Sequence, residues 1–171
     1  MLWAAGLIAA LLAAAAPNGA GAPGEVSAAA APPPRVLIKD APRLKGSPTV
    51  ITPYGAWVPR PARDGVFAFL GIPYARQPVG ALRWREPAPP ESSGEVRTAF
   101  EYGHTARQLP DENEPASLTP QGEDCLTLNI WTRRVDGPPR PVLLWIHGGA
   151  NVSGGTADPM YDGHDFVRQN D

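Results

Sequence analysis

The chain has 171 residues and a formal net charge of −2, and 43% of its residues are hydrophobic, which suits a globular protein. No run of basic residues occurs, so binding to nucleic acid or to an anionic membrane is not indicated. The 22 prolines and 18 glycines predict many loops and turns. The single cysteine, Cys125, excludes an intrachain disulfide and is expected to pack as a small apolar residue. No Cys–His spacing typical of a metal site occurs, so neither a metal nor a cofactor is predicted.

Residues 1–22 are typical of a secretory signal peptide, because a Leu/Ala-rich run over 2–16 is followed by small residues. That run is shorter than the roughly 20 residues needed by a membrane-spanning helix. No basic residue precedes it, so a cytoplasmic protein stays open as the alternative to a secreted or periplasmic one. Residues 23–47 are rich in Ala, Pro and Gly and lack the large apolar residues of a core. They predict a disordered linker that carries no chemistry.

The folded part, residues 48–171, is expected to begin with three short strands. Thr49–Thr52 and Gly55–Val58 are β-type runs separated by Pro-Tyr, which predicts a hairpin. The tripeptide Arg63-Asp64-Gly65 is typical of a turn, and Val66–Leu70 is the third predicted strand.

Residues 91–121 are polar and show no sustained period, which predicts a long loop with at most one helical turn. Its carboxylates Asp111, Glu112 and Glu114 are expected to be solvated rather than to bind a metal. Beyond this loop, Leu126–Thr132 alternates apolar and polar residues, which predicts a strand with one buried face.

Val142–Ile146 is an uninterrupted apolar run, bounded by Pro141 and by His147-Gly-Gly149, and it predicts a buried strand. A turn at residues 136–139 would place this strand beside Leu126–Thr132. Two adjacent glycines let the backbone bend tightly and expose neighbouring N–H groups, which is what an oxyanion requires. An ordinary exit from a strand into a loop is the alternative interpretation. A short helix is expected over residues 165–170.

Five short motifs follow one another along this part of the chain. They are Thr52-Pro-Tyr-Gly55, Phe69-Leu-Gly-Ile-Pro-Tyr-Ala75, Pro78-Val-Gly-Ala-Leu-Arg-Trp84, Glu123-Asp-Cys-Leu-Thr-Leu-Asn-Ile-Trp131 and Pro141-Val-Leu-Leu-Trp-Ile-His-Gly-Gly-Ala-Asn151. Together they resemble the N-terminal portion of the type-B carboxylesterases, the cholinesterase-like family of the α/β-hydrolase fold. The resemblance implies an α/β fold, of which residues 48–171 would form the first part. That part would consist mostly of strands and loops of the central sheet, followed by one short helix.

In this family an H-G-G-[GA] turn supplies the N–H groups of the oxyanion hole. The resemblance places these donors at the backbone of Gly149 and Ala150, in a loop shaped by His147 and Gly148. Asn151 stands where the family usually has an aromatic residue, which implies a more polar wall of the acyl pocket. In many members the cysteine of Glu-Asp-Cys-Leu is bridged to an upstream cysteine, but here Ala106 occupies that upstream position.

The family's nucleophile elbow, G-x-S-x-G, does not occur in the chain. In the family's chain order the serine, the acid and the histidine base all follow the oxyanion loop, so none of the three is expected in this chain. His104 and His164 lie in loop-like sequence without visible partners.

The resemblance therefore implies part of a carboxylic-ester hydrolase that acts on a small-molecule ester through a serine acyl-enzyme. The chain by itself is expected to be inactive. A non-catalytic, cholinesterase-like binding or adhesion module is the alternative, and an independent small β domain is a third interpretation.

Overall fold

The computed structural model describes residues 47–109 and 120–170. The predicted signal peptide (1–22), all but the last residue of the predicted linker (23–47) and the acidic residues at 111, 112 and 114 lie outside the described residues. Those three expectations therefore stay predictions. Within the described ranges, no helix is long and apolar enough to cross a membrane.

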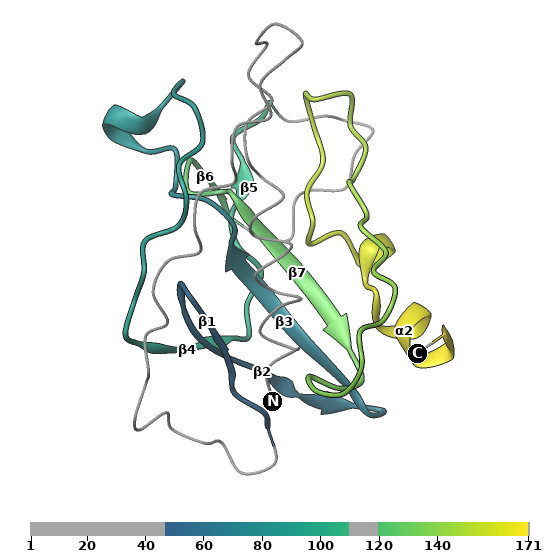
Figure 1. Ribbon diagram of the computed structural model, residues 1–171. Helices are drawn as coiled ribbons and strands as arrows, with labels where there is room; N and C mark the ends of the chain where they lie inside the picture. Colours follow the sequence, from purple (N-terminus) through teal and green to yellow (C-terminus); the bar gives the residue numbers. More distant parts are fainter. Residues whose placement is uncertain (1–46, 110–119, 171) are drawn as a thin grey trace, which may run out of the picture.

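Five strands form the main sheet, in the order β1-β2-β3-β7, with β4 paired to β2 (Figure 1). The strands are β1 (Val50–Thr52), β2 (Gly55–Arg63), β3 (Val66–Pro73), β4 (Val96–Ala99) and β7 (Thr127–Thr132). Two further strands form a separate parallel pair, β5 (Thr105–Ala106) and β6 (Gln121–Gly122). The helical elements are η1 (Gly80–Leu82), η2 (Pro159–Tyr161) and α2 (His164–Asn170).

The first two connections in the sheet follow from local sequence. β1 and β2 form an antiparallel hairpin in which Thr52 pairs with Gly55. Between β2 and β3, Asp64 and Gly65 both have positive φ values, 50° and 77°. Successive positive φ values are what a two-residue turn needs to match the twist of the strands it joins. The predicted hairpin and the predicted turn are both confirmed.

β7 lies antiparallel beside β3, with Phe69 opposite Ile130 and Ile72 opposite Leu128. The register shifts between these two pairs, where Gly71 has a φ of 67° and donates its amide hydrogen to Asn129 Oδ1 at 2.9 Å. The predicted strand is confirmed. Its buried face is incomplete, because every residue of β7 remains partly accessible to solvent.

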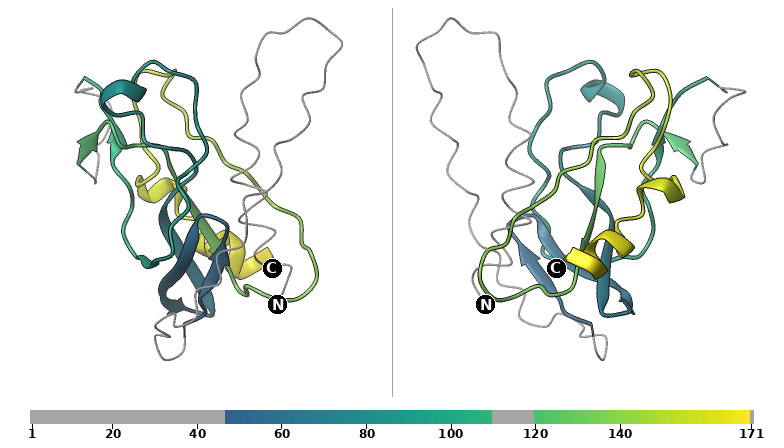
Figure 2. Two further views of the ribbon diagram at one scale, coloured as in Figure 1. Left: turned by 60° about the vertical axis from the view of Figure 1, so that its left-hand side comes forward. Right: turned by 90° about the vertical axis from the view of Figure 1, so that its right-hand side faces the viewer.

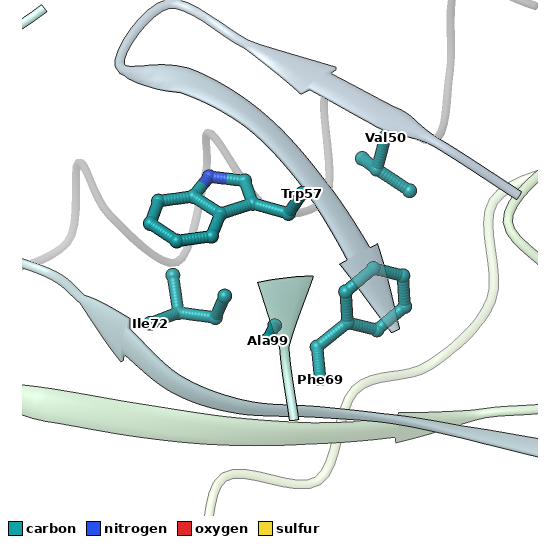
Figure 3. Packing of buried hydrophobic residues seen from close by; sticks show 5 residues of the cluster. All are labelled: Val50, Trp57, Phe69, Ile72 and Ala99. Atoms are coloured by element: carbon teal, nitrogen blue, oxygen red, sulfur yellow. The ribbon is translucent and has the colours of Figure 1, made fainter. Parts of the chain in front are cut away.

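The core lies between the strands of the main sheet and is small (Figure 3). Its buried side chains are Val50, Trp57, Phe69, Ile72 and Ala99. Figure 3 shows that they converge from β1, β2, β3 and β4. Complete burial of a side chain the size of Phe69 or Ile72 stabilises the fold by about 1.5–3 kcal/mol.

Val142–Ile146 is not a strand, and that prediction is wrong. All five side chains are exposed, with Trp145 66% and Ile146 79% accessible. In both views of Figure 2 the segment between β7 and η2, coloured green to yellow, runs as a long loop outside the sheet. The predicted neighbour, β7, pairs with β3 instead, and no described strand hydrogen-bonds to Val142–Ile146. A continuous apolar run becomes a buried strand only where other elements cover both of its faces.

The loop predicted over residues 91–121 contains strands that the sequence did not reveal. β4 pairs in parallel with β2, and β5 pairs with β6, which begins at the last residue of the predicted loop. These strands are two to four residues long, too short for a period to be recognised. The predicted helix at the end of the chain is confirmed as α2, which begins one residue earlier, at His164.

Candidate functional site

Residues 149–152 form a tight turn, called here the Gly149 turn. The amides of Val152 and Ser153 both donate to the carbonyl oxygen of Gly149, at 2.9 and 3.0 Å. Gly149, Ala150 and Asn151 have φ values of 107°, 52° and 62°. Asn tolerates this left-handed region, whereas Ala150 stores about 1–2 kcal/mol of backbone strain. A Cβ on Gly149 would collide with the carbonyl oxygen of Ser153, so the position requires glycine.

The amides of Gly149 and Ala150 are the two predicted oxyanion donors. Neither donates a hydrogen bond to any residue that the structure describes, although the amides of Val152 and Ser153, a little further along the chain, are both used within the turn. The Gly149 turn thus keeps two neighbouring N–H groups available. Unpaired N–H groups are energetically costly unless water or a ligand accepts their hydrogen bonds.

The other two predicted loop residues lie directly before the turn. His147 donates from Nδ1 to the carbonyl oxygen of Gly148 at 2.8 Å, which fixes its ring against the loop. The same ring stacks on Tyr161 of η2, with centroids 6.3 Å apart. Gly148 has open space around its Cα, so it supplies flexibility rather than a close approach.

The segment after the turn is attached to the β5–β6 pair. Gln108 Nε2 donates to the carbonyl oxygen of Gly154 at 2.9 Å, and the amide of Gly154 donates to Gln108 Oε1 at 2.8 Å. Gly155 packs against Thr105, and a Cβ at Gly155 would lie 2.7 Å from the threonine hydroxyl. These contacts bring residues 46 to 50 positions apart in the sequence onto one surface.

A hollow of about 240 Å³ lies between the Gly149 turn and β5. It is lined by His104, Thr105, Ala106, Arg107, Gln108, Cys125, His147, Asn151, Val152, Ser153, Gly154, Gly155 and Thr156. Most of these side chains are polar, and Asn151 is among them. From the Gly149 turn, Asn151 and Val152 line the hollow, whereas Gly149 and Ala150 do not.

Cys125 and Ala106 both line this hollow, and Cys125 is a free thiol. Burial, followed by the negative charges of Asp124 and Glu123, raises the pKa of Cys125. A thiol with a raised pKa is a poor nucleophile at neutral pH, because the thiolate is the reactive form.

His104 has a partner that the sequence did not reveal. Its Nδ1 donates to Asp124 Oδ1 at 2.6 Å, and this hydrogen bond lowers the pKa of the Asp124 carboxyl. His164 also has partners, since its buried ring donates from Nε2 to the carbonyl oxygen of Arg63 at 3.0 Å. The sequence shows no partner for either histidine, and the structure supplies one for each. The partners lie 20 and 101 positions away, so no sequence spacing could indicate them.

In the part of the chain that the structure describes, no serine hydroxyl is hydrogen bonded to a histidine. The His104–Asp124 pair therefore lacks the serine that a catalytic triad would require. Among residues 47–109 and 120–170, no three His, Cys, Asp or Glu side chains are grouped as metal ligands.

Known proteins with similar sequences are esterases and related hydrolases. The phenmedipham hydrolase of Pseudarthrobacter oxydans is 44% identical over 113 residues, which cover 63% of this chain and 23% of that enzyme. The para-nitrobenzyl esterase of Bacillus subtilis (strain 168) is 38% identical over 122 residues, covering 70% of this chain and 25% of the esterase. The chain thus spans about a quarter of the length of these relatives.

Solved structures give the same result for the fold. A Geobacillus stearothermophilus carboxylesterase matches with a TM-score of 0.63 and 43% identity, over 72% of this chain and 24% of that one. A para-nitrobenzyl esterase structure matches with a TM-score of 0.63 and 38% identity, over 71% of this chain and 25% of that one. The described strands and the one short helix therefore form the first part of an α/β-hydrolase fold, and the predicted fold class is confirmed.

The sequence model of the carboxylesterase family matches residues 54–171, which is more than half of the chain. This chain belongs to the carboxylesterase family.

Proposed function

We propose that this chain is the part of a carboxylic-ester hydrolase that holds the oxyanion of the reacting ester. The amides of Gly149 and Ala150 donate to the carbonyl oxygen of a small-molecule ester as a nucleophile attacks the carbonyl carbon. Negative charge develops on that oxygen in the transition state, so two fixed donors lower the barrier. Loss of one such donor costs about 2.7–4 kcal/mol of transition-state stabilisation.

The observation that carries the proposal is the pair of available N–H groups at the Gly149 turn. Neither N–H group donates to an acceptor among the described residues, and the next two residues of the turn, Asn151 and Val152, line the hollow. The left-handed backbone of Gly149 and Ala150 is a strained arrangement of the kind that concentrates at functional sites.

In this proposal, the chain does not contain the nucleophile, the acid or the base of the reaction. The missing groups belong to the three quarters of the fold that the relatives possess and this sequence does not cover. The 171-residue chain alone is therefore expected to hydrolyse p-nitrophenyl butyrate no faster than buffer.

A hybrid enzyme tests the proposal. Residues 54–171 replace the corresponding N-terminal part of the Bacillus subtilis para-nitrobenzyl esterase, and turnover of p-nitrophenyl butyrate is measured. We expect the folded hybrid to be active. Substitution of Ala150 by lactic acid, which replaces the N–H with an ester oxygen, is expected to lower kcat about 100- to 1000-fold.

Lactic acid at Ala88 is the matched control, because the amide of Ala88 also donates to no residue within the described ranges and Ala88 lies outside the hollow. This second ester should leave kcat unchanged. A folded hybrid whose kcat is insensitive to the ester at Ala150 would contradict the proposal. An inactive folded hybrid would favour the binding or adhesion module instead.

We further propose, from the sequence of residues 1–22, that these residues are a signal peptide and that the protein is secreted or periplasmic. Residues 1–47 fused to a reporter enzyme that is active only after export should give reporter activity in whole cells. A fusion of residues 23–47 alone should give none.

A further inference from the structure

Two glutamine side chains in this fold bind a distant backbone segment in the way that a neighbouring strand would. Gln108 exchanges two hydrogen bonds with Gly154, at 2.8 and 2.9 Å. Gln77 exchanges two with Leu126, at 3.0 and 3.2 Å. In each pair the side-chain amide donates to a backbone carbonyl and accepts from the N–H of the same residue. A side chain that satisfies both backbone groups of one residue fixes that residue's position and orientation.

Gln108 is itself held by the structure around β5. Its backbone amide donates to Gln121 Oε1 at 3.1 Å. Its Nε2 also donates to the carbonyl oxygen of Ala106, at 3.0 Å. The residue that reaches Gly154 is therefore held at its backbone amide and at its side-chain amide.

Gly154 in turn lies against the Gly149 turn. A Cβ at Gly154 would lie 2.9 Å from the carbonyl oxygen of Gly148 and 3.0 Å from His147 Nδ1. The preceding residue, Ser153, donates its amide hydrogen to the carbonyl oxygen of Gly149. A continuous series of hydrogen bonds and close contacts thus runs from β5, through Gln108 and Gly154, to the residue that begins the turn.

The Gly149 turn needs such support from its C-terminal side. On its N-terminal side, Val142–Ile146 is in no ladder with any described strand. The turn also holds Ala150 in the left-handed region, a conformation that persists only where the surroundings enforce it. Among the described contacts, two hydrogen bonds from the side chain of Gln108 to the backbone of Gly154 connect residues 152–155 to the segment that follows β5.

We propose that Gln108 is a positioning residue for the two amide donors of Gly149 and Ala150. This inference rests on the proposed function, because the two donors are positioned in order to bind the oxyanion. The geometry itself exists without substrate. Gln108 acts through Gly154 and does not itself donate to the oxyanion.

The test uses the full 171-residue chain, labelled with ¹⁵N, and measures backbone order parameters at Ala150 and Asn151. In the unsubstituted chain we expect values near 0.85, as in rigid backbone, and in Gln108→Leu values below about 0.6. Strand β3 should keep its order parameters in both proteins. Gln77→Leu is the matched control, because it removes the same two types of hydrogen bond from Leu126 and should leave Ala150 and Asn151 rigid.

Gln108→Glu adds a readout that a general loss of stability would not produce. An ionised carboxylate still accepts from the amide of Gly154 but cannot donate to its carbonyl oxygen. A neutral carboxyl regains the donor, so order at Ala150 should fall at pH 7 and recover as the pH is lowered through about 4.3. The unsubstituted chain should show no such recovery.

Two results would overturn the proposal. One is unchanged order at Ala150 and Asn151 in Gln108→Leu, and the other is equal loosening of the turn by Gln77→Leu. If Gln108→Leu fails to fold, Gln108→Glu is measured in its place, and a turn that stays rigid at pH 7 then rejects the proposal. None of these measurements depends on ester hydrolysis, so the conclusion about Gln108 would remain valid even if the hybrid enzyme were inactive.

Discussion

Gly149 is the residue at which the backbone of the candidate site leaves no room for a side chain. Its φ of 107° is unfavourable for any other residue, and a Cβ would meet the carbonyl oxygen of Ser153. At its neighbour Gly148 an added Cβ would have no atom within 4 Å, and the φ of Gly148 is not positive. Two adjacent glycines of one loop therefore have different physical roles.

Gly149→Ala is expected to lower the free energy of unfolding by more than about 1 kcal/mol, because alanine must adopt a left-handed conformation and displace Ser153. Gly148→Ala should change it by less than about 0.5 kcal/mol. Urea denaturation followed by far-ultraviolet circular dichroism measures both. Equal effects of the two substitutions would show that the Gly149 turn does not have this conformation in solution.

The His104–Asp124 hydrogen bond predicts that the stability of the folded chain depends on pH. It lowers the pKa of Asp124 in the folded chain below the ordinary value of about 3.9. The stabilisation is therefore complete above that ordinary value and is lost as the pH falls through the lower, folded-state pKa. Both side chains are about half exposed, 42% and 51%, so the contribution is expected to be at most about 1 kcal/mol.

Asp124→Asn should accordingly destabilise the chain at pH 6, and the difference from the unsubstituted chain should shrink as the pH approaches 3. Denaturation curves at several pH values give this difference. Asp136→Asn is the control, because Asp136 is exposed and forms no ion pair with residues that the structure describes. A difference that grows toward low pH would contradict the assignment.

At the scale of elements, two isoleucines in similar apolar runs lie in opposite environments. Ile72 on β3 is fully buried, and Ile146, which the sequence places in a strand, is 79% exposed. Ile72→Val is expected to lower the free energy of unfolding by about 0.5–1.5 kcal/mol. Ile146→Val removes the same methyl group and should change it by less than about 0.5 kcal/mol. A cost at Ile146 as large as at Ile72 would mean that residues 142–146 are buried after all.

Elements with a recognisable local signal were predictable from the sequence, and elements without one were not. The Asp64-Gly65 turn and α2 form within a few positions of the chain, and β7 shows an alternation of apolar and polar residues although its partner β3 is distant; all three are confirmed. Val142–Ile146 has the composition of a strand, but no described strand lies beside it. Composition alone does not reveal whether a ladder partner is present.

The same distinction applies to the candidate site. The His147-Gly-Gly-Ala150 motif is local, so its residues could be named from the sequence as oxyanion donors, which stays a prediction. The pairs His104–Asp124 and Gln108–Gly154 join residues 20 and 46 positions apart. No motif encodes those pairs, and only the folded chain brings their members together.

At the scale of the whole molecule, the exposed run Val142–Ile146 dominates the expected behaviour in solution. Together with Val152 and Phe166 it leaves many large apolar side chains uncovered. Exposed apolar surface of this kind promotes association between molecules. We expect the purified 171-residue chain to self-associate with increasing concentration, as measured by sedimentation velocity.

Leu143→Lys combined with Leu144→Lys should suppress that association without loss of the fold, because both leucines are exposed. Met160→Lys is the control, since it changes an even more exposed apolar residue outside the run. Association that persists in the double variant would place the associating surface elsewhere on the molecule.

Trp145 lies within this run, 66% exposed, and its ring centroid is 6.0 Å from that of Tyr161. An indole in water fluoresces at longer wavelength than an indole in an apolar environment. The chain has five tryptophans, and the contribution of Trp145 to their emission will therefore shift to shorter wavelength when another polypeptide covers residues 142–146.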